Sequence, residues 1–285
     1  DETLQLWNRG FSEYYSDMTM EMSGMMRHIA RHNISPAHSV VAFVDGKPAG
    51  FVFIGMKTVS GEKLAWNGGT GLDPAYRGRG IGKAMMAEVE QVLRAEEVDI
   101  AYLEVVSKNI KAIRSYENGG FNKDIRLAGK VRTGAIEGRP FQYDEAELKG
   151  WRLEAVQPIK VSQLPFYRKH AAWDGQWHQF QPGQVSLVYD DAGEPATYAF
   201  YRRNLDAEGN LSSVVLHQCE VRPGLDKSKK ALYGKLLTEI YGPLDVECTR
   251  STGNLPMTCP LLLQLLEQAG FKEKYEQFLM IWRPL

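Results

Sequence analysis

Cysteine is scarce in this sequence of 285 residues, and several other absences narrow the class of protein. The three cysteines lie in the second half of the chain without CxxC spacing: Cys219, Cys248 and Cys259. A small odd number argues against a disulfide framework or a zinc site and favours free thiols in a reducing compartment. No apolar run approaches membrane-spanning length, and the N-terminal stretch lacks a basic-then-apolar signal pattern. We therefore expect a cytoplasmic protein that binds neither metal nor membrane.

An excess of either charge is also missing. The 34 Lys and Arg nearly balance the 35 Asp and Glu, for a formal net charge of −1. This balance argues against an overall electrostatic nucleic-acid binder, so no nucleic-acid partner is expected. An apolar fraction of 44 % and a charged fraction of 24 % are close to globular averages, and the length suits two domains.

Strand and helix signals alternate along the first half and predict an α/β fold. The dipeptides Asp45-Gly46 and Ser60-Gly61 are hairpin signals that divide residues 38–72 into three strands. Apolar spacing predicts the other elements: helices over 3–18, around 25–29, over 82–96 and over 109–120, a strand over 100–106, and two further strands before about residue 145.

The second half repeats this order. VSLVYDDAGEPATYAF resembles VVAFVDGKPAGFVF, and their prolines, Pro48 and Pro195, are 147 positions apart. LEQAGF resembles YENGGF, with Phe121 and Phe271 separated by 150 positions. Matches in the same order at nearly constant offset predict an internal duplication. We expect two tandem domains, residues 1–147 and 148–285, each a twisted mixed β-sheet flanked by helices.

A glycine-rich loop stands between the third strand and the next helix. Its sequence is Arg77-Gly78-Arg79-Gly80-Ile81-Gly82, followed by Lys83. It is neither a Walker A loop nor a GxGxxG dinucleotide fingerprint, because the glycine spacing differs. Glycines let successive N–H groups face a ligand, and a helix N-terminus with basic side chains favours an anion. The loop therefore predicts a site for a diphosphate.

Two motifs together resemble the GCN5-related N-acetyltransferase (GNAT) family. The first is the Q/R-x-x-G-x-G/A pattern at Arg77–Gly82, with Leu72 and Pro74 ahead of it. The second is a strand, Asn109, and a helix carrying Tyr116 before Gly120-Phe121. The resemblance covers about residues 1–145 and implies a mixed sheet with helices on both faces, acetyl-CoA as cosubstrate and an amine as acceptor.

The resemblance also implies roles for single residues. Tyr116 would protonate the departing CoA thiolate in a direct transfer, since a phenol is protonated at neutral pH. The residues implied in cofactor binding are Thr70, Gly71 and Leu72 for the pantetheine arm, Arg77, Gly78, Arg79, Gly80, Ile81, Gly82 and Lys83 for the pyrophosphate, and Asn109. No metal is implied.

The general base is not identified by the sequence. Many family members carry a carboxylate on the strand before the loop, but LAWNGGTGL has none. Asp17, Glu21 and Glu104 are the candidates. His28 and His32 lack the glutamate of a metalloprotease motif and are interpreted as surface residues.

The second copy has lost the residues that the first one uses. After Pro223 the loop reads GLDKSKK, in which side chains replace the glycines and Asp226 would repel phosphate. Leu266 stands where Tyr116 stands in the first copy and cannot donate a proton. The second domain is thus predicted to be a degenerate copy that serves as a scaffold.

These residues are compatible with three functions. The leading one is an N-acetyltransferase acting on a small-molecule or peptide amine, as a monomer or homodimer. A non-catalytic acyl-CoA sensor or scaffold is the alternative, favoured by the missing strand carboxylate. An interaction module without a CoA site is the third.

Overall fold

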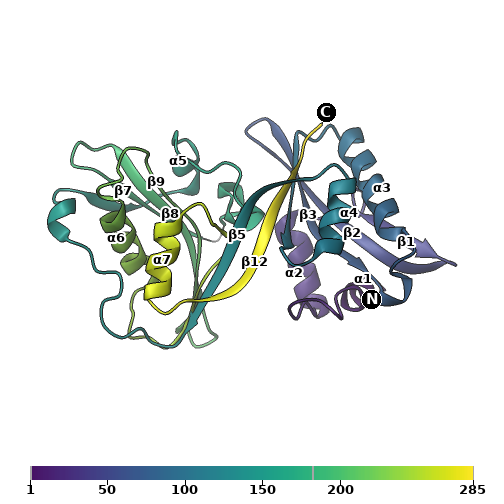
Figure 1. Cartoon of the computed structure of the whole chain (residues 1–285), viewed down its shortest axis with the longest axis horizontal. Coiled ribbons are helices and arrows are strands. Elements are labelled where there is room, and N and C mark those ends of the chain that lie inside the picture. Colours follow the sequence, from purple (N-terminus) through teal and green to yellow (C-terminus); the bar gives the residue numbers. More distant parts are fainter. Residues whose placement is uncertain (1, 182, 285) are drawn as a thin grey trace. The chain divides into compact units, whose positions relative to one another are not determined.

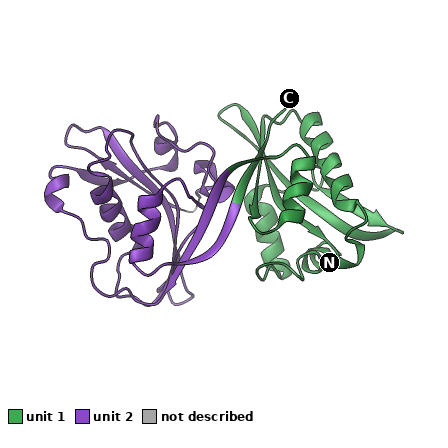
Figure 2. Ribbon diagram, viewed as in Figure 1, with its two compact units in different colours: residues 1–124, 278–285 green, residues 125–277 purple. Residues whose placement is uncertain are grey.

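The computed structural model describes residues 2–181 and 183–284. They form two compact units, shown in Figure 2: unit 1 comprises residues 1–124 and 278–285, and unit 2 comprises residues 125–277. Unit 1 thus contains both the beginning and the end of the chain. The predicted division after residue 147 separates the two sequence copies, whereas the compact units are divided elsewhere.

Unit 1 is a mixed sheet with helices on both faces, which confirms the predicted fold class. Its elements, all but β4 labelled in Figure 1, are α1 (Glu2–Gly10), α2 (Met22–His32), β1 (Val40–Val44), β2 (Lys47–Val59), β3 (Glu62–Leu72), α3 (Ile81–Ala95), β4 (Ile100–Val106), α4 (Ile110–Asn118), the start of β5 (Asn122–Thr133) and the end of β12 (Lys272–Trp282). The sheet order is β1-β2-β3-β4-β12.

The two predicted hairpin turns join β1 to β2 and β2 to β3. Both residues of each turn have positive φ, 49° and 73° at Asp45-Gly46 and 51° and 85° at Ser60-Gly61. Two consecutive positive φ angles define the type I′ geometry that matches the twist of a hairpin. The structure therefore confirms both hairpin turns, which were predicted from these two dipeptides.

Other expected elements end earlier than predicted. The helix expected over residues 3–18 ends at Gly10, and the chain then turns without regular structure until α2. Only β5 is found where two strands were expected before residue 145, because Gly134, Gly138 and Pro140 follow it. Gly134 and Gly138 have φ of 95° and 72°, which takes the backbone out of the extended conformation.

β3 separates from β4 part-way along its length. The two strands pair in parallel from Leu64–Ile100 to Trp66–Tyr102. On its other side β3 pairs with β2, where the register passes from Ile54↔Asn67 to Phe53↔Gly69 and leaves Gly68 as a bulge. A bulge bends its strand, so β3 turns away from β4 just beyond the last paired residues.

Each face of the unit 1 sheet has its own core. Val52, Ile54 and Met56 of β2 pack with α3 and α4, while Phe51 and Phe53 pack with α1 and α2. This alternation follows from the two-residue period of a strand. Close contacts explain two glycines of β3: a Cβ on Gly69 would lie 2.5 Å from the ring of Trp7 on α1, and one on Gly71 would lie 2.4 Å from the ring of Phe51 on β2.

Unit 2 repeats the same order of elements. It contains the rest of β5, then β6 (Arg152–Ala155), α5 (Pro158–Ser162), β7 (Gln184–Tyr189), β8 (Pro195–Leu205), β9 (Leu211–Val221), α6 (Lys229–Tyr241), β10 (Thr249–Thr252), β11 (Leu255–Pro256), α7 (Pro260–Gln268) and the start of β12. α7 has nine residues, like α4, and begins 150 positions later. The bulge of Gly68 recurs at His217 on β9, 149 positions later. The structure thus confirms the internal duplication.

The last strand of each copy crosses from one unit into the other. β5 begins in unit 1 at Asn122 and continues into unit 2, and its counterpart β12 begins in unit 2 at Lys272 and ends in unit 1 at Trp282. Met280 and Trp282 are buried in the unit 1 core with α3 and α4. The sheet of unit 1 therefore includes the end of β12, the last strand of the second sequence copy. Unit 2 includes most of β5, the last strand of the first copy.

Candidate active site

The glycine loop leads from β3 into α3. After a 3-10 turn at Pro74–Tyr76, Gly78 and Gly80 adopt φ of 78° and 79°, and a Cβ on either would meet no atom within 4 Å. Ala84 donates to the Gly80 carbonyl at 3.1 Å, so the N–H groups of residues 81–83 form the free first turn of the helix. A main chain that is open here, with the positive end of a helix, fits a diphosphate.

Arg77 has a structural role beside this loop. Its guanidinium donates to the Leu72 carbonyl at 3.2 Å, to Glu13 Oε2 at 2.5 Å and to the Gly10 carbonyl at 3.3 Å. These contacts hold the end of α1 against β3. Arg79, which lies 5.5 Å over the Tyr76 ring, and Lys83 are the other exposed basic side chains at the loop. A cofactor contact of Arg77 stays a prediction.

The strand residues predicted to line the pantetheine arm follow the bulge. Thr70, Gly71 and Leu72 pair with β2 on one side, and their register with β4 has already ended at Trp66. One edge of this segment is thus left for main-chain hydrogen bonds to an extended ligand. The Leu72 side chain packs with α3, so the main chain faces the ligand and the side chain faces the core.

Tyr116 lies on α4 with its phenol beside β3. The residue is 8 % exposed, and its hydroxyl is hydrogen-bonded to the Thr70 side chain. Thr70 Oγ1 in turn donates to Asn67 Oδ1 at 3.1 Å, and Asn67 Oδ1 also accepts from the Gly69 N–H at 3.1 Å. Burial raises the pKa of Tyr116, and the Thr70 hydrogen bond opposes this shift. The phenol is therefore kept protonated, as a proton donor must be.

Asn109 joins this cluster from the N-terminus of α4. Its Oδ1 accepts from the Ala112 N–H at 3.2 Å and caps the helix. The Tyr14 phenol is hydrogen-bonded to the Asn109 side chain, and Tyr15 Oη donates to the Lys108 carbonyl at 3.2 Å. The α1–α2 connection is thus fastened to the β4–α4 loop by two tyrosines. Sequence reasoning missed Tyr14, whose only sequence signal is its place in the YY pair.

The environment of Tyr14 predicts a pH dependence of stability. Burial, then the neighbouring Tyr116 and Tyr15, raise the pKa of Tyr14 to about 12, against 10.0 ordinarily. Between pH 10 and 12 the unfolded chain loses this proton before the folded protein does, so the free energy of unfolding falls with pH. The loss from this group is up to about 2.5 kcal/mol.

Urea unfolding at pH 9 and pH 11.5 tests this shift. Tyr14→Phe is expected to lose less stability between the two pH values than the wild type. Tyr15→Phe, at the exposed neighbouring tyrosine, removes only the smallest of the three causes and should lie much closer to the wild type than Tyr14→Phe does. A Tyr14→Phe curve parallel to the wild type would contradict the buried-phenol interpretation.

The three carboxylates considered as general base occupy different places. Asp17 is exposed, and hydrogen bonds from Thr19 lower its pKa, so it is engaged within its own turn. Glu21 is exposed just before α2. Glu104 lies on β4, half-buried, and accepts a hydrogen bond from Trp66 Nε1 at 2.8 Å. Only Glu104 of the three lies where β3 and β4 separate.

The interpretation of His28 and His32 as surface residues is wrong. His32 is 5 % exposed, and its ring lies 4.5 Å from the Trp66 ring. His28 is half-buried with Nε2 at 2.8 Å from the Gly68 carbonyl. Both rings pack α2 against the bulged part of β3, which the sequence spacing does not reveal. Among residues 2–181 and 183–284, no group of three or more His, Cys, Asp or Glu side chains could hold a metal ion.

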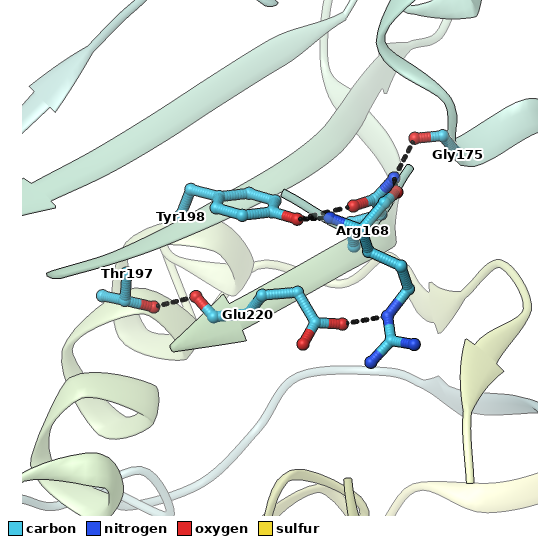
Figure 3. A network of polar contacts seen from close by, with 6 residues as sticks. Arg168, Gly175, Thr197, Tyr198 and Glu220 are labelled. Atoms are coloured by element: carbon cyan, nitrogen blue, oxygen red, sulfur yellow. Dashed lines mark hydrogen bonds and ion pairs between the residues drawn. The ribbon is translucent and has the colours of Figure 1, made fainter. Parts of the chain in front are cut away.

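The matching place in unit 2 is filled by its own side chains (Figure 3). Glu220, 149 positions after Gly71, forms an ion pair with Nε of Arg168. Tyr198 Oη accepts from the Arg168 N–H at 2.9 Å and donates to Gln218 Oε1 at 2.9 Å. Gln218 Nε2 donates to the Gly175 carbonyl at 2.8 Å. A network of polar side chains thus involves β9, the strand of unit 2 that corresponds to β3, at positions where β3 carries glycine and threonine.

The loop of unit 2 also differs in its backbone. Of its residues only Gly224 has positive φ, 89°, and α6 begins at Lys229 after Ser228 with φ of −90°. Leu266 is fully buried in the unit 2 core. These contacts supply the physical basis for the prediction that the second copy is degenerate.

The fold of the whole chain is similar to that of several solved acetyltransferases, one of them a tandem GNAT protein. The glucosamine N-acetyltransferase region of a fungal multi-domain GH3 beta-N-acetylglucosaminidase matches with a TM-score of 0.68 at 13 % identity, over 99 % of this chain and 36 % of that one. A GCN5-related N-acetyltransferase from Anabaena variabilis gives 0.59 at 16 % identity, over 98 % and 70 %. A tandem GNAT protein from the clavulanic acid biosynthesis pathway gives 0.56 at 15 %, over 98 % and 93 %.

A family model matches the N-terminal part of the sequence. The model of the acetyltransferase (GNAT) family matches residues 1–121. The match covers less than half of the chain, and the chain as a whole is similar in fold to a tandem GNAT protein. It spans about a third of the fungal multi-domain protein. No curated protein sequence matches it significantly. No helix of the described residues is both long and apolar enough to cross a membrane.

Proposed function

We propose that unit 1 transfers an acetyl group from acetyl-CoA to an amine acceptor. The observation that carries the proposal is the buried, protonated Tyr116 bonded to Thr70, on the strand that leads into the glycine loop. Acetyl-CoA supplies the acetyl group as a thioester. The N–H groups of residues 78–83 would hold its diphosphate, and the free edge of residues 70–72 would hold its pantetheine arm.

Tyr116 acts in this proposal as the general acid. Its phenol is close to β3, and burial keeps it protonated, so it has a proton to donate to the departing thiolate. Thr70 orients the hydroxyl, and Asn67 orients Thr70 through the hydrogen bond at 3.1 Å. Removing the hydroxyl should therefore affect turnover and leave the binding of the cofactor intact.

Tyr116→Phe tests this role. We expect kcat to fall by about a hundredfold, the order attributed to a positioned acid, with Kd for acetyl-CoA within about twofold of wild type. Tyr233→Phe removes a similarly buried hydroxyl from unit 2 and serves as the control, with unchanged kcat. Equal kcat in Tyr116→Phe and wild type would remove Tyr116 from the mechanism.

A non-catalytic acyl-CoA sensor or scaffold is the second candidate, favoured by the absence of a carboxylate in the β3 segment from Leu64 to Leu72. Thiol release from acetyl-CoA separates the two functions when a panel of amines is supplied. The panel contains glucosamine, lysine, spermidine, 2-phenylethylamine and a peptide with a free N-terminus. An enzyme releases CoA only with acceptor present, whereas a sensor binds acetyl-CoA and releases none.

The two sequence copies, residues 1–147 and 148–285, are proposed to share this work unequally. The first would carry the cofactor site and Tyr116. In the second, the Arg168–Glu220 ion pair and the lysines after Gly224 leave no comparable main-chain surface. We infer that the second copy contributes structure, above all β12, and not a second transfer site.

A further inference from the structure

The outer edge of the unit 1 sheet is an apolar strand with exposed side chains. Among residues 2–181 and 183–284, β1 pairs with β2 alone, and its sequence, VVAFV, contains no charged or polar side chain. Val40 and Ala42 pack on the core under α3. Val41 and Phe43 alternate with them onto the other face of the sheet and are 43 % and 63 % exposed. An edge strand without charge is a template for pairing with another strand.

The corresponding strand of unit 2 is covered by a further strand. β7 is the counterpart of β1, because Tyr189 pairs with Pro195 as Phe43 pairs with Pro48, and the register shifts at this pair in both hairpins. All four residues of β6 pair antiparallel with β7. With β6 in place, Tyr189 is 8 % exposed, against 63 % for Phe43. This edge of the repeated fold therefore accepts an antiparallel strand.

The positions of unit 1 that match β6 form a helix instead. At the offset of 147 positions that relates Pro48 to Pro195, β6 corresponds to residues 5–8, which lie in α1. Leu6 and Trp7 of α1 pack with Phe51 and Phe53, so the helix covers one face of β2. The segment that could extend the sheet beyond β1 is thus used to cover its face. The edge of β1 is left unpaired within the part of the chain that the structure describes.

We propose that this edge pairs with β1 of a second copy of the chain. A two-fold axis through Ala42 makes the two strands antiparallel, as β6 and β7 are. It places Val41 opposite the partner's Phe43 on the exposed face, and Val40 opposite the partner's Val44 on the other face. The strand is therefore complementary to itself, which is the requirement for an interface built from the same surface of both copies. Apolar cross-strand pairs of this kind stabilise a sheet.

The charges and the regularity of the strand favour this partner. In the two-fold register Asp45 lies opposite the partner's Ser39, so no like charges face each other between residues 39 and 45. The bulge of the β1–β2 pair has its extra residue, Ala49, on β2, so β1 itself is regular. A strand of five residues buries less than the roughly 1,600 Å² of a standard interface, and we expect a dimer with Kd of about 10–100 μM. The inference does not depend on the transfer proposed for unit 1.

Sedimentation equilibrium of the full chain tests the proposal. Over about 1–200 μM the wild type should pass from monomer to dimer. Val41→Glu and Phe43→Lys each place a charge opposite an apolar side chain and should raise Kd by at least about tenfold. The double variant Val41→Glu/Phe43→Lys places each glutamate opposite a lysine of the partner and should recover most of the affinity. Both side chains are exposed in the monomer, so thermal unfolding of the variants should match the wild type.

Leu205→Lys is the control. Leu205 is 63 % exposed, like Phe43, but lies on β8 of unit 2, and this variant should dimerise as the wild type does. A wild type that stays monomeric up to about 200 μM overturns the proposal, and the edge would then be open to a strand of another protein. A dimer that Phe43→Lys leaves unchanged also overturns it. Loss of the dimer in both single variants without recovery in the double variant excludes the two-fold pairing through Ala42.

Discussion

Replacing Gly80 by valine is expected to weaken the binding of acetyl-CoA by more than about a hundredfold, because the change acts on the main chain that would hold the diphosphate. Gly80 is the N-cap of α3, with φ of 79°. A β-branched residue is strained at this φ, and its side chain would project into the open space beside the loop. The free N–H groups of the first turn would be displaced or covered. Isothermal titration with acetyl-CoA measures the effect.

Gly224→Val is the matched control on the same chain. Gly224 has φ of 89° and open space beside its Cα, so valine introduces the same strain in the corresponding loop of unit 2. We expect similar losses of thermal stability in the two variants and a loss of cofactor affinity in Gly80→Val alone. If Gly224→Val abolished binding and Gly80→Val did not, the cofactor site would belong to unit 2.

The glycine loop could be predicted from the sequence because its geometry is local. Positive φ at Gly78 and Gly80 follows from residue type and position, as do the hairpin turns at Asp45 and Ser60. The repeat was visible for the same reason, since turns and helix ends recur at nearly constant offset. α1 was predicted too long because apolar spacing continues past Gly10, whereas the helix ends at Gly10, where a Cβ would lie 3.0 Å from Gly71.

Contacts between segments far apart in the chain could not be predicted from the sequence. Arg77 matched a loop motif, yet its side chain donates hydrogen bonds to the end of α1 and to Glu13, which lies 64 positions earlier in the sequence. Glu104 stood among three candidate carboxylates, and only the hydrogen bond from Trp66, 38 positions away, distinguishes it. Tyr14 gave no signal beyond its place in the YY pair. Such partners are set by tertiary packing, which overrides local propensity.

The exchange of terminal strands leads to the prediction with the largest effect on the fold. A chain that ends at Gln277 loses Met280 and Trp282, which are 0 % and 1 % exposed in the unit 1 core. Trp282 packs on the turn after α4, where a Cβ on Gly120 would lie 3.0 Å from its ring, and Arg94 lies 5.6 Å over it. Removing one large core side chain costs about 3–5 kcal/mol, and a domain has only about 5–15 kcal/mol in total.

We therefore expect unit 1 of the shortened chain to be unfolded and acetyl-CoA binding to be lost, although residues 1–124 are intact. Near-ultraviolet circular dichroism and isothermal titration measure the two effects. A chain that ends at Trp282 keeps the buried strand and is the control, with wild-type binding. Trp282→Ala should lower the free energy of unfolding by about 3–5 kcal/mol without abolishing the fold. Wild-type affinity in the chain ending at Gln277 would show that unit 1 closes its sheet without β12. The expected loss would instead explain why a copy without its own cofactor loop persists in the chain: it supplies the strand that completes the other unit.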